Sequence, residues 1–111
     1  MVYMTVASVK VQMPLVLPAE LVEEITSWSL RLDRSASWLL SAAWSLSRDW
    51  VASLSPERAA EEREEVAGGK HPRAWFVPAE SMLEICHACE RLGLEPEDVV
   101  QMAWSFSRPG P

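Results

Sequence analysis

The chain contains the same 31-residue pattern twice, and the two occurrences begin 60 residues apart. When residues 18–48 are aligned with residues 78–108, 12 of the 31 positions are identical and no gap is needed. Two unrelated segments of this length would share about two residues by chance. A repeat of this kind dominates the choice of fold. We therefore expect two copies of one structural unit.

A short segment of alternating character precedes the repeated proline of each copy. The alternation runs over residues 9–17 in the first copy and residues 72–77 in the second. A period of two is typical of a β-strand with one buried face. The predicted inward side chains are Met13, Leu15, Leu17, Arg73, Trp75 and Val77. The predicted outward side chains are Gln12, Pro14, Val16, Pro72, Ala74 and Phe76.

Two helices are predicted after each strand. Their expected ranges are 19–32 and 36–53 in the first copy, and 79–92 and 96–107 in the second. The first helix carries a single apolar face, formed by Leu21, Ile25, Trp28 and Leu32. Each copy is thus a strand–helix–helix unit.

Helix starts and stops are marked by residues suited to those positions. Pro18 and Pro78 suit the first turn of a helix, where a missing N–H costs little. Ser35 can cap the second helix of the first copy. In the second copy, Gly93 is a natural helix end and Pro96 a natural helix start. These signals support the predicted boundaries.

An acidic connector joins the two copies. Ser55 and Pro56 form a typical helix start, and Gly68 and Gly69 a typical stop. Because few apolar residues lie between them, we expect a solvated acidic helix or a partly disordered tether. The predicted organisation is a first copy at 9–54, a connector at 55–70 and a second copy at 71–108. Both copies are expected in one folded domain.

The order of elements resembles the ribbon-helix-helix superfamily of Met-repressor-like and Arc-like regulators. The resemblance is carried by residues 15–21, 32–37, 39–40 and 43, and in the second copy by residues 76–80 and 92–93. It implies a mainly α fold with a short two-stranded antiparallel ribbon (α+β), to which each unit gives one strand. Two copies in one chain then predict a single-chain pseudo-dimer. Pairing between chains, with four units in a dimer, is the alternative.

In that superfamily the ribbon lies in the DNA major groove, and the start of the second helix binds a phosphate. The resemblance therefore implies a transcription regulator that binds DNA. On this interpretation the candidate nucleic-acid-binding residues are Lys10, Gln12, Arg34, Ser35 and Ser37.

Several features predict that any DNA binding is atypical and asymmetric. Of the six outward strand residues, only Gln12 can form directional hydrogen bonds to base edges. The second copy carries Glu95, Glu97 and Asp98 at the place of the phosphate contact, and these carboxylates would repel a phosphate. The net charge of −6 also opposes binding to a polyanion.

The alternative hypothesis is a protein-interaction module that does not bind DNA, such as an antirepressor-like partner of another regulatory protein. Its candidate partner-binding residues are Pro14, Val16, Trp38, Ala74 and Phe76. Trp38 is expected to face solvent because its counterpart is Asp98. Exposed apolar patches and exposed Trp are enriched in binding sites. Further homo-oligomerisation, and coverage of the patch by the connector or the N-terminal segment, both stay open.

The sequence gives no indication of a metal site or an enzyme active site. Cys86 and Cys89 have the C-x-x-C spacing, but a structural zinc site needs four ligands and the chain has two Cys and two His. We predict no metal, no cofactor and no enzymatic activity. The chain lacks a basic, signal-like start and a long apolar run. We therefore expect a cytoplasmic protein that does not contact a membrane.

Overall fold

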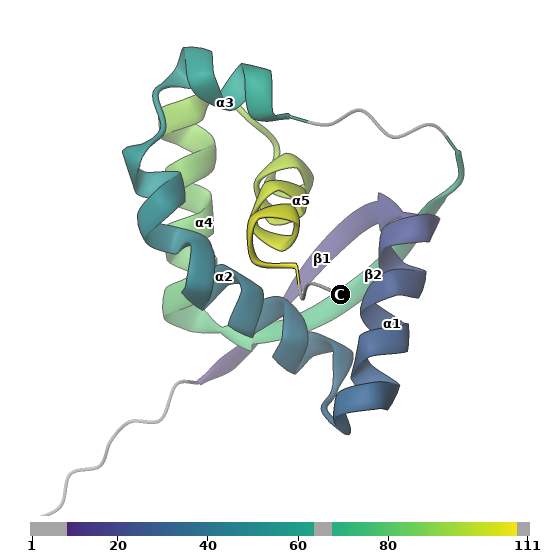
Figure 1. The fold of residues 1–111 in the computed structure, drawn as a ribbon. Helices are drawn as coiled ribbons and strands as arrows, with labels where there is room; N and C mark the ends of the chain where they lie inside the picture. The colour runs from purple at the N-terminus through teal and green to yellow at the C-terminus, as the bar shows by residue number, and fades with distance from the viewer. Residues whose placement is uncertain (1–8, 64–67, 109–111) are drawn as a thin grey trace, which may run out of the picture.

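The structure is a computed structural model that describes residues 9–63 and 68–108. The elements follow in the order β1 (Lys10–Pro18), α1 (Ala19–Leu32), α2 (Ala36–Ser53), α3 (Pro56–Glu62), β2 (Lys70–Pro78), α4 (Ala79–Leu92) and α5 (Pro96–Ser107). The fold is mainly helical with one two-stranded antiparallel sheet (Figure 1). The four helices predicted in the two copies are confirmed, as is the α+β class.

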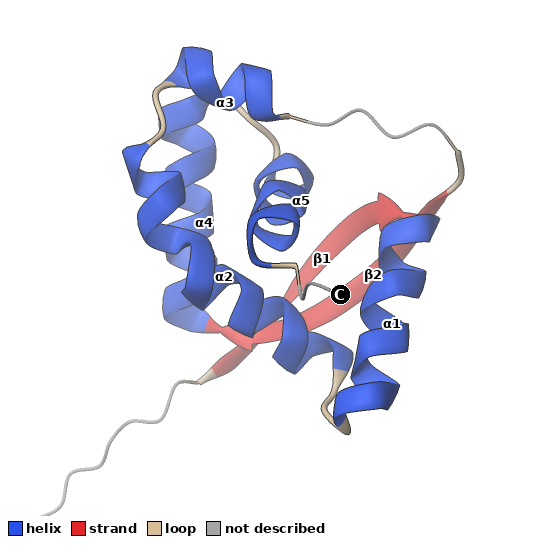
Figure 2. Cartoon of the chain, viewed as in Figure 1, coloured by secondary structure: helices blue, strands red, loops and turns tan. Residues whose placement is uncertain are grey.

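The two strands pair antiparallel over their whole length. Lys10 lies opposite Pro78, and Pro18 lies opposite Lys70. At the centre, Pro14 lies opposite Ala74, which is the same position in the other copy. Figure 2 shows the strands side by side as one ribbon that runs behind the helices. The strand pairing is therefore symmetric about its central pair.

Backbone hydrogen bonds at the two ends of the ribbon repeat this symmetry. The Ala19 amide, the first of α1, donates to the Gly69 carbonyl at 2.9 Å. The Ala79 amide, the first of α4, donates to the Val9 carbonyl at 2.8 Å. Each helix start is thus tied to the residue that precedes the other copy's strand.

One face of the ribbon packs against the helices and forms one side of the core. Five of the six predicted inward side chains are buried there: Met13, Leu15, Leu17, Trp75 and Val77. Ile25 and Ile85 cover them from α1 and α4, and Trp44 and Trp104 from α2 and α5. The core therefore draws on both copies.

The prediction that Arg73 points into the core is wrong. Arg73 is exposed, and its guanidinium carbon lies 4.4 Å from the centre of the Trp75 ring. The long apolar stem of an arginine can cover a hydrophobic surface while its charge stays in water. Arg73 therefore closes the edge of the core over Trp75 without entering it.

Leu32 is a second correction. It was predicted on the buried face of α1, but it is 47% exposed, whereas its counterpart Leu92 is 5% exposed. α3 packs against α4, where Leu92 lies, so the end of α4 is covered. α1 ends at the surface, and Leu32 lies there.

Helix caps follow the predicted residues. The Ser35 hydroxyl accepts from the Trp38 amide at 3.0 Å, which caps α2. Gly93 ends α4 in the left-handed region with φ 69°, and Asp33 takes the same conformation at the end of α1 with φ 54°. Gly tolerates this conformation best, and Asp more easily than most residues. The Ser35 cap and the Gly93 stop are confirmed.

The connector helix is shorter than predicted. The Ser55 hydroxyl accepts from the Arg58 amide at 3.0 Å and starts α3 as expected. α3 ends at Glu62, before the Gly68-Gly69 stop, and residues 64–67 lie outside the described residues. Ala59 is fully buried, so this helix is anchored by one small side chain.

Two ion pairs join the copies at equivalent positions. Arg48 of α2 lies 3.3 Å from Glu84 of α4, and Arg108, just after α5, lies 2.8 Å from Glu24 of α1. All four side chains are partly exposed, so each pair contributes at most about 1 kcal/mol. The second helix of each copy is thus held against the first helix of the other.

Candidate binding face on the ribbon

The outer face of the ribbon is almost entirely apolar. Gln12 lies opposite Phe76, Pro14 opposite Ala74, and Val16 opposite Pro72. Phe76 is 50% exposed and Val16 is 42% exposed. The predicted outward orientation of these side chains is confirmed. We call the six side chains Gln12, Pro14, Val16, Pro72, Ala74 and Phe76 the outer ribbon face.

Side chains from the starts of α2 and α5 each bind one edge of the ribbon. The Phe76 amide donates to the Ser37 hydroxyl at 3.0 Å, and the Val16 amide donates to a Glu97 carboxylate oxygen at 3.0 Å. Ser37 and Glu97 are equivalent positions of the two copies. Free strand edges invite pairing with another strand, and these two bonds occupy one N–H on each edge.

These two edge bonds were not predicted from the sequence. Ser37 was considered only as a phosphate contact, and Glu97 only as a charge that repels phosphate. The signal that could have indicated them is their shared position, two residues into the second helix of each copy. The bonds also depend on the strand register, because each joins one copy's helix to the other copy's strand.

One end of the ribbon gathers most of the candidate residues. Gln12 lies across from Phe76, which bonds to Ser37 at the start of α2. The neighbouring Trp38 is 45% exposed, as predicted, and the Arg34 guanidinium lies 5.1 Å from its ring centre. This end also includes Ser35, the α2 cap, and Lys10, the first residue of β1. The Ser37–Phe76 bond thus connects the start of α2 to the part of the ribbon that carries Gln12.

The start of α5, at the opposite end of the ribbon, is acidic. There Val16 bonds to Glu97, and the adjacent Glu95 and Asp98 form a capping box in which each side chain accepts the other's amide. Asp98 also lies 3.3 Å from Arg63. These carboxylates satisfy amides at the start of α5 and suit the positive end of its dipole. Two backbone amides that could bind a phosphate already donate to these carboxylates, and the negative charge would repel a phosphate.

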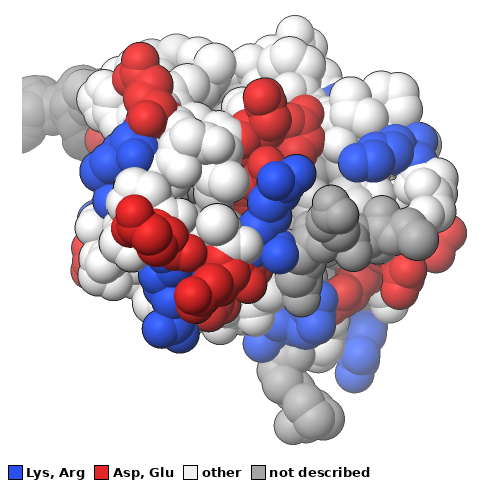
Figure 3. Space-filling view, turned by 90° about the horizontal axis from the view of Figure 1, so that it is seen from above, with Lys and Arg blue, Asp and Glu red and all other residues white. Residues whose placement is uncertain are grey.

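Charges of both signs are mixed on the face of the molecule that looks upward in Figure 1. Figure 3 shows this face, on which basic and acidic side chains alternate and no continuous basic surface forms. A DNA-binding protein usually concentrates its basic residues on one face. The view in Figure 3 offers no such surface.

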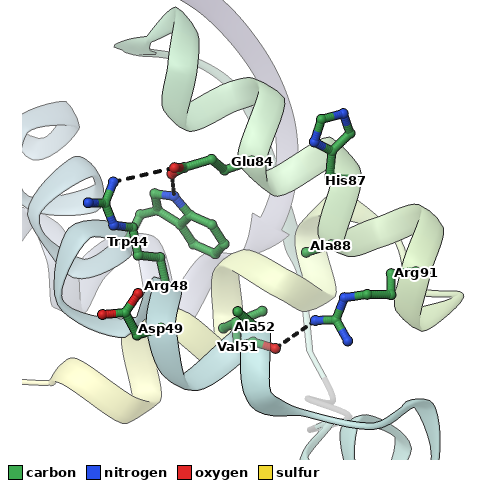
Figure 4. Close-up of a pocket in the computed structure, with 9 residues that line it drawn as sticks. All are labelled: Trp44, Arg48, Asp49, Val51, Ala52, Glu84, His87, Ala88 and Arg91. Atoms are coloured by element: carbon green, nitrogen blue, oxygen red, sulfur yellow. Dashed lines mark hydrogen bonds and ion pairs between the residues drawn. The ribbon is translucent and has the colours of Figure 1, made fainter.

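A pocket of about 450 Å³ lies between α2 and α4, as Figure 4 shows. The Trp44 indole N–H donates to Glu84 at 2.8 Å, and Arg91 donates to the carbonyls of Val51 and Leu54 at 2.8 and 2.6 Å. Ala88 lines the pocket where the first copy has the much larger Trp28. The hydrogen bonds of Trp44 and Arg91 hold α4 against the second half of α2.

The two cysteines differ in exposure. Cys86 is exposed and Cys89 is half-buried. Burial, followed by the nearby Cys86 and the acidic start of α5, raises the pKa of the Cys89 thiol to about 11. Cys89 is therefore a protonated thiol at neutral pH. Within residues 9–63 and 68–108, no three His, Cys, Asp or Glu side chains are placed to hold a metal ion.

Comparisons with known proteins give no further assignment. No protein-family model, no curated protein and no solved structure matches this chain significantly. Among the described helices, none combines the length and apolar character needed to cross a membrane.

Proposed function

We propose that this protein is a single-chain ribbon-helix-helix pseudo-dimer whose outer ribbon face binds another protein. The pseudo-dimer is supported by contacts that the exchange of the two copies maps onto one another or onto themselves. These are the central Pro14–Ala74 pair, the two edge hydrogen bonds and the two ion pairs between the copies. Each repeated contact joins one copy to the other, as a two-fold dimer requires.

The observation that carries the binding proposal is the apolar character of the outer ribbon face. In the superfamily that the sequence resembles, this face reads bases, and base reading needs hydrogen-bonding side chains. Here five of its six side chains offer none, and Phe76 is half exposed. Aromatic side chains at the centre of an interface often contribute most of its binding energy. An apolar strip of this kind fits a protein surface better than a polyanion.

A photo-crosslinking amino acid at position 76 tests the proposal in cells that express the full chain. We expect covalent capture of a defined protein by this variant. A crosslinker at Glu90, exposed on α4, is the matched control and should not capture the same protein. Val16→Asp, in the chain that carries the position-76 crosslinker, should abolish capture without lowering the melting temperature. Capture that is equal from both positions, or insensitive to Val16→Asp, would refute the proposal.

Asymmetric DNA binding is the second candidate function, and one observation favours it. Gln12 lies opposite Phe76, whose amide donates to the Ser37 hydroxyl, and Arg34 and Ser35 precede Ser37 at the start of α2. Lys10 begins the strand that carries Gln12. Five polar groups on one side could contact a single stretch of backbone.

A filter-binding titration with random duplex DNA at low salt separates the two candidates. The protein-binding proposal predicts no retention at micromolar protein. Retention that weakens with salt, and weakens further in Arg34→Ala and Lys10→Ala, would favour the DNA-binding candidate, because phosphate contacts release counterions. Glu90→Ala is the control, since it lies away from the ribbon.

A further inference from the structure

The two ends of the outer ribbon face carry different charge at equivalent positions. The first copy places Arg34, Ser35 and Ser37 at the start of α2, where the second copy places Leu94, Glu95 and Glu97 at the start of α5. Arg34 is exposed and lies over the ring of Trp38. Divergence of the copies has thus placed a cation beside Asp33 at one helix start and two carboxylates at the other, while Lys10 and Lys70 remain alike at the two ends of the ribbon.

A second copy of the chain, related to the first by a two-fold axis, can place opposite charges against each other. In a face-to-face dimer the axis lies in the plane of the interface. If it runs perpendicular to the line that joins the two helix starts, the α2 start of each protomer lies over the α5 start of its partner. Opposite charges then meet twice, because every contact in a two-fold interface occurs twice. In an undiverged repeat, like charges would have met instead.

We propose that the outer ribbon face binds a second copy of this chain, with the Arg34 end of one protomer over the Glu95–Glu97 end of its partner. This inference rests on the proposed function and names the partner. The apolar strip forms the centre of the interface, and the charged ends form its rim and select the orientation. Like-charge rims in the other orientations would be disfavoured by repulsion.

The dimensions of the ribbon predict a weak dimer. Nine residues per strand give a ribbon roughly 30 Å long at about 3.3 Å per residue. With the two helix starts included, roughly 500 Å² per protomer, or about 1,000 Å² in total, would be buried, which is below the standard size of stable interfaces. We therefore expect a dissociation constant on the order of micromolar, so that the dimer forms and dissociates with protein concentration.

Sedimentation equilibrium of the full chain, from roughly 1 to 500 μM, tests the association directly. We expect a monomer at the lowest concentrations and a dimer at the highest. Phe76→Asp should remain monomeric throughout while its melting temperature stays within a few degrees of the wild type, because Phe76 is half exposed. A wild type that is monomeric at every concentration, or a dimer that survives Phe76→Asp, overturns the inference.

A charge exchange tests the orientation. Arg34→Glu and Glu97→Arg should each weaken the dimer at least tenfold, because like charges then face each other at both ends. An equimolar mixture of the two variants, and the double variant Arg34→Glu/Glu97→Arg, should dimerise as well as the wild type does. Rescue cannot arise from misfolding of either single variant. Two weak singles with no rescue would overturn the charge pairing.

The outcomes also separate this inference from the proposed function. If the position-76 crosslinker captures a different protein while the wild type stays monomeric, the second copy is the wrong partner and the proposed function stands. If the crosslinker captures no protein in a Val16-dependent way and the wild type stays monomeric, both fail. A dimer with charge-exchange rescue supports both.

Discussion

Pro14 and Ala74 lie opposite each other at the centre of the ribbon, although 60 positions separate them in the chain. They hold the same place in the two repeated units. A strand pairing that is centred on equivalent residues makes the contacts on one side of the centre recur on the other side. The hydrogen bonds at the strand edges and the ion pairs between helices follow from this arrangement.

Ser37→Ala should loosen one edge of the ribbon. The Ser37 hydroxyl accepts the Phe76 amide at 3.0 Å, so its removal leaves that amide to water. We expect the amide of Phe76 to exchange with deuterium faster, and the free energy of unfolding to fall by about 0.5–1.5 kcal/mol. Hydrogen exchange and urea denaturation measure these effects.

Ser45→Ala is the matched control for Ser37→Ala. Ser45 is exposed on the same helix, and its loss should leave the Phe76 amide unchanged. Equal exchange rates at Phe76 in the wild type and in Ser37→Ala would show that this edge bond does not form in solution.

Glu84→Ala should destabilise the protein more than Arg48→Ala. Glu84 accepts from the buried Trp44 indole N–H and also pairs with Arg48. An indole N–H that loses its only acceptor costs about 1–3 kcal/mol, whereas the loss of an exposed ion pair costs at most about 1 kcal/mol. Glu84→Gln keeps an acceptor and should fall between the two. Equal losses in Glu84→Ala and Arg48→Ala would contradict this assignment.

The regular elements could be predicted from the sequence because the repeat supplies the same signal twice. The bounds of α1 in one copy and α4 in the other support each other, and the strand alternation indicates which side chains face outward. Arg73 and Leu32 were mispredicted for local reasons. A strand pattern does not reveal that a long side chain can lean back to the surface, and a helix pattern does not reveal which helix end is covered.

The two hydrogen bonds at the ribbon edges could not be predicted, because they depend on contacts between the copies. The bonds from Phe76 to Ser37 and from Val16 to Glu97 require the register of two strands and the placement of two helices. The two ion pairs between the copies could have been predicted more readily from the sequence. Arg48 and Arg108 are identical across the repeat, as are Glu24 and Glu84, and identical charged residues at surface positions can indicate paired contacts.

Trp44→Phe should cost more stability than Trp104→Phe, although the two residues occupy equivalent positions. Both rings are buried, but the Trp44 indole N–H has Glu84 as its partner, while the Trp104 indole N–H finds no acceptor within residues 9–63 and 68–108. Phenylalanine removes a satisfied donor in the first case and an unsatisfied donor in the second. We expect a difference of about 1 kcal/mol in the free energy of unfolding. A larger loss in Trp104→Phe would contradict the assignment.

Cys89 should resist alkylation in the folded protein. Burial raises the pKa of its thiol from 9.0 to about 11, so only about one molecule in a thousand carries the reactive thiolate at pH 8. Mass spectrometry after iodoacetamide treatment of Cys86→Ser should show slow labelling that accelerates in urea.

The same shift makes a stability prediction. The folded protein binds the Cys89 proton more tightly than the unfolded chain does. The contribution of the protonated thiol to the free energy of unfolding is therefore complete below pH 9 and is lost as the pH rises towards 11. Relative to Cys89→Ser, stability should decline over that window. Rapid labelling of folded Cys86→Ser at pH 8 would contradict both expectations.

A disulfide at the centre of the ribbon tests most directly whether the two copies pair within one chain. Directly opposite residues of an antiparallel pair lie about 4.5–5.5 Å apart at Cα, which a disulfide can bridge. In a Cys86→Ser/Cys89→Ser background, Pro14→Cys/Ala74→Cys should oxidise at nanomolar protein to a monomer about 2 Da lighter, at a rate independent of concentration. Pro14→Cys/Ala52→Cys, with its second site at the far end of α2, should not oxidise in this way. Disulfide-linked dimers alone, forming at a rate that rises with protein concentration, would show that the copies pair between chains.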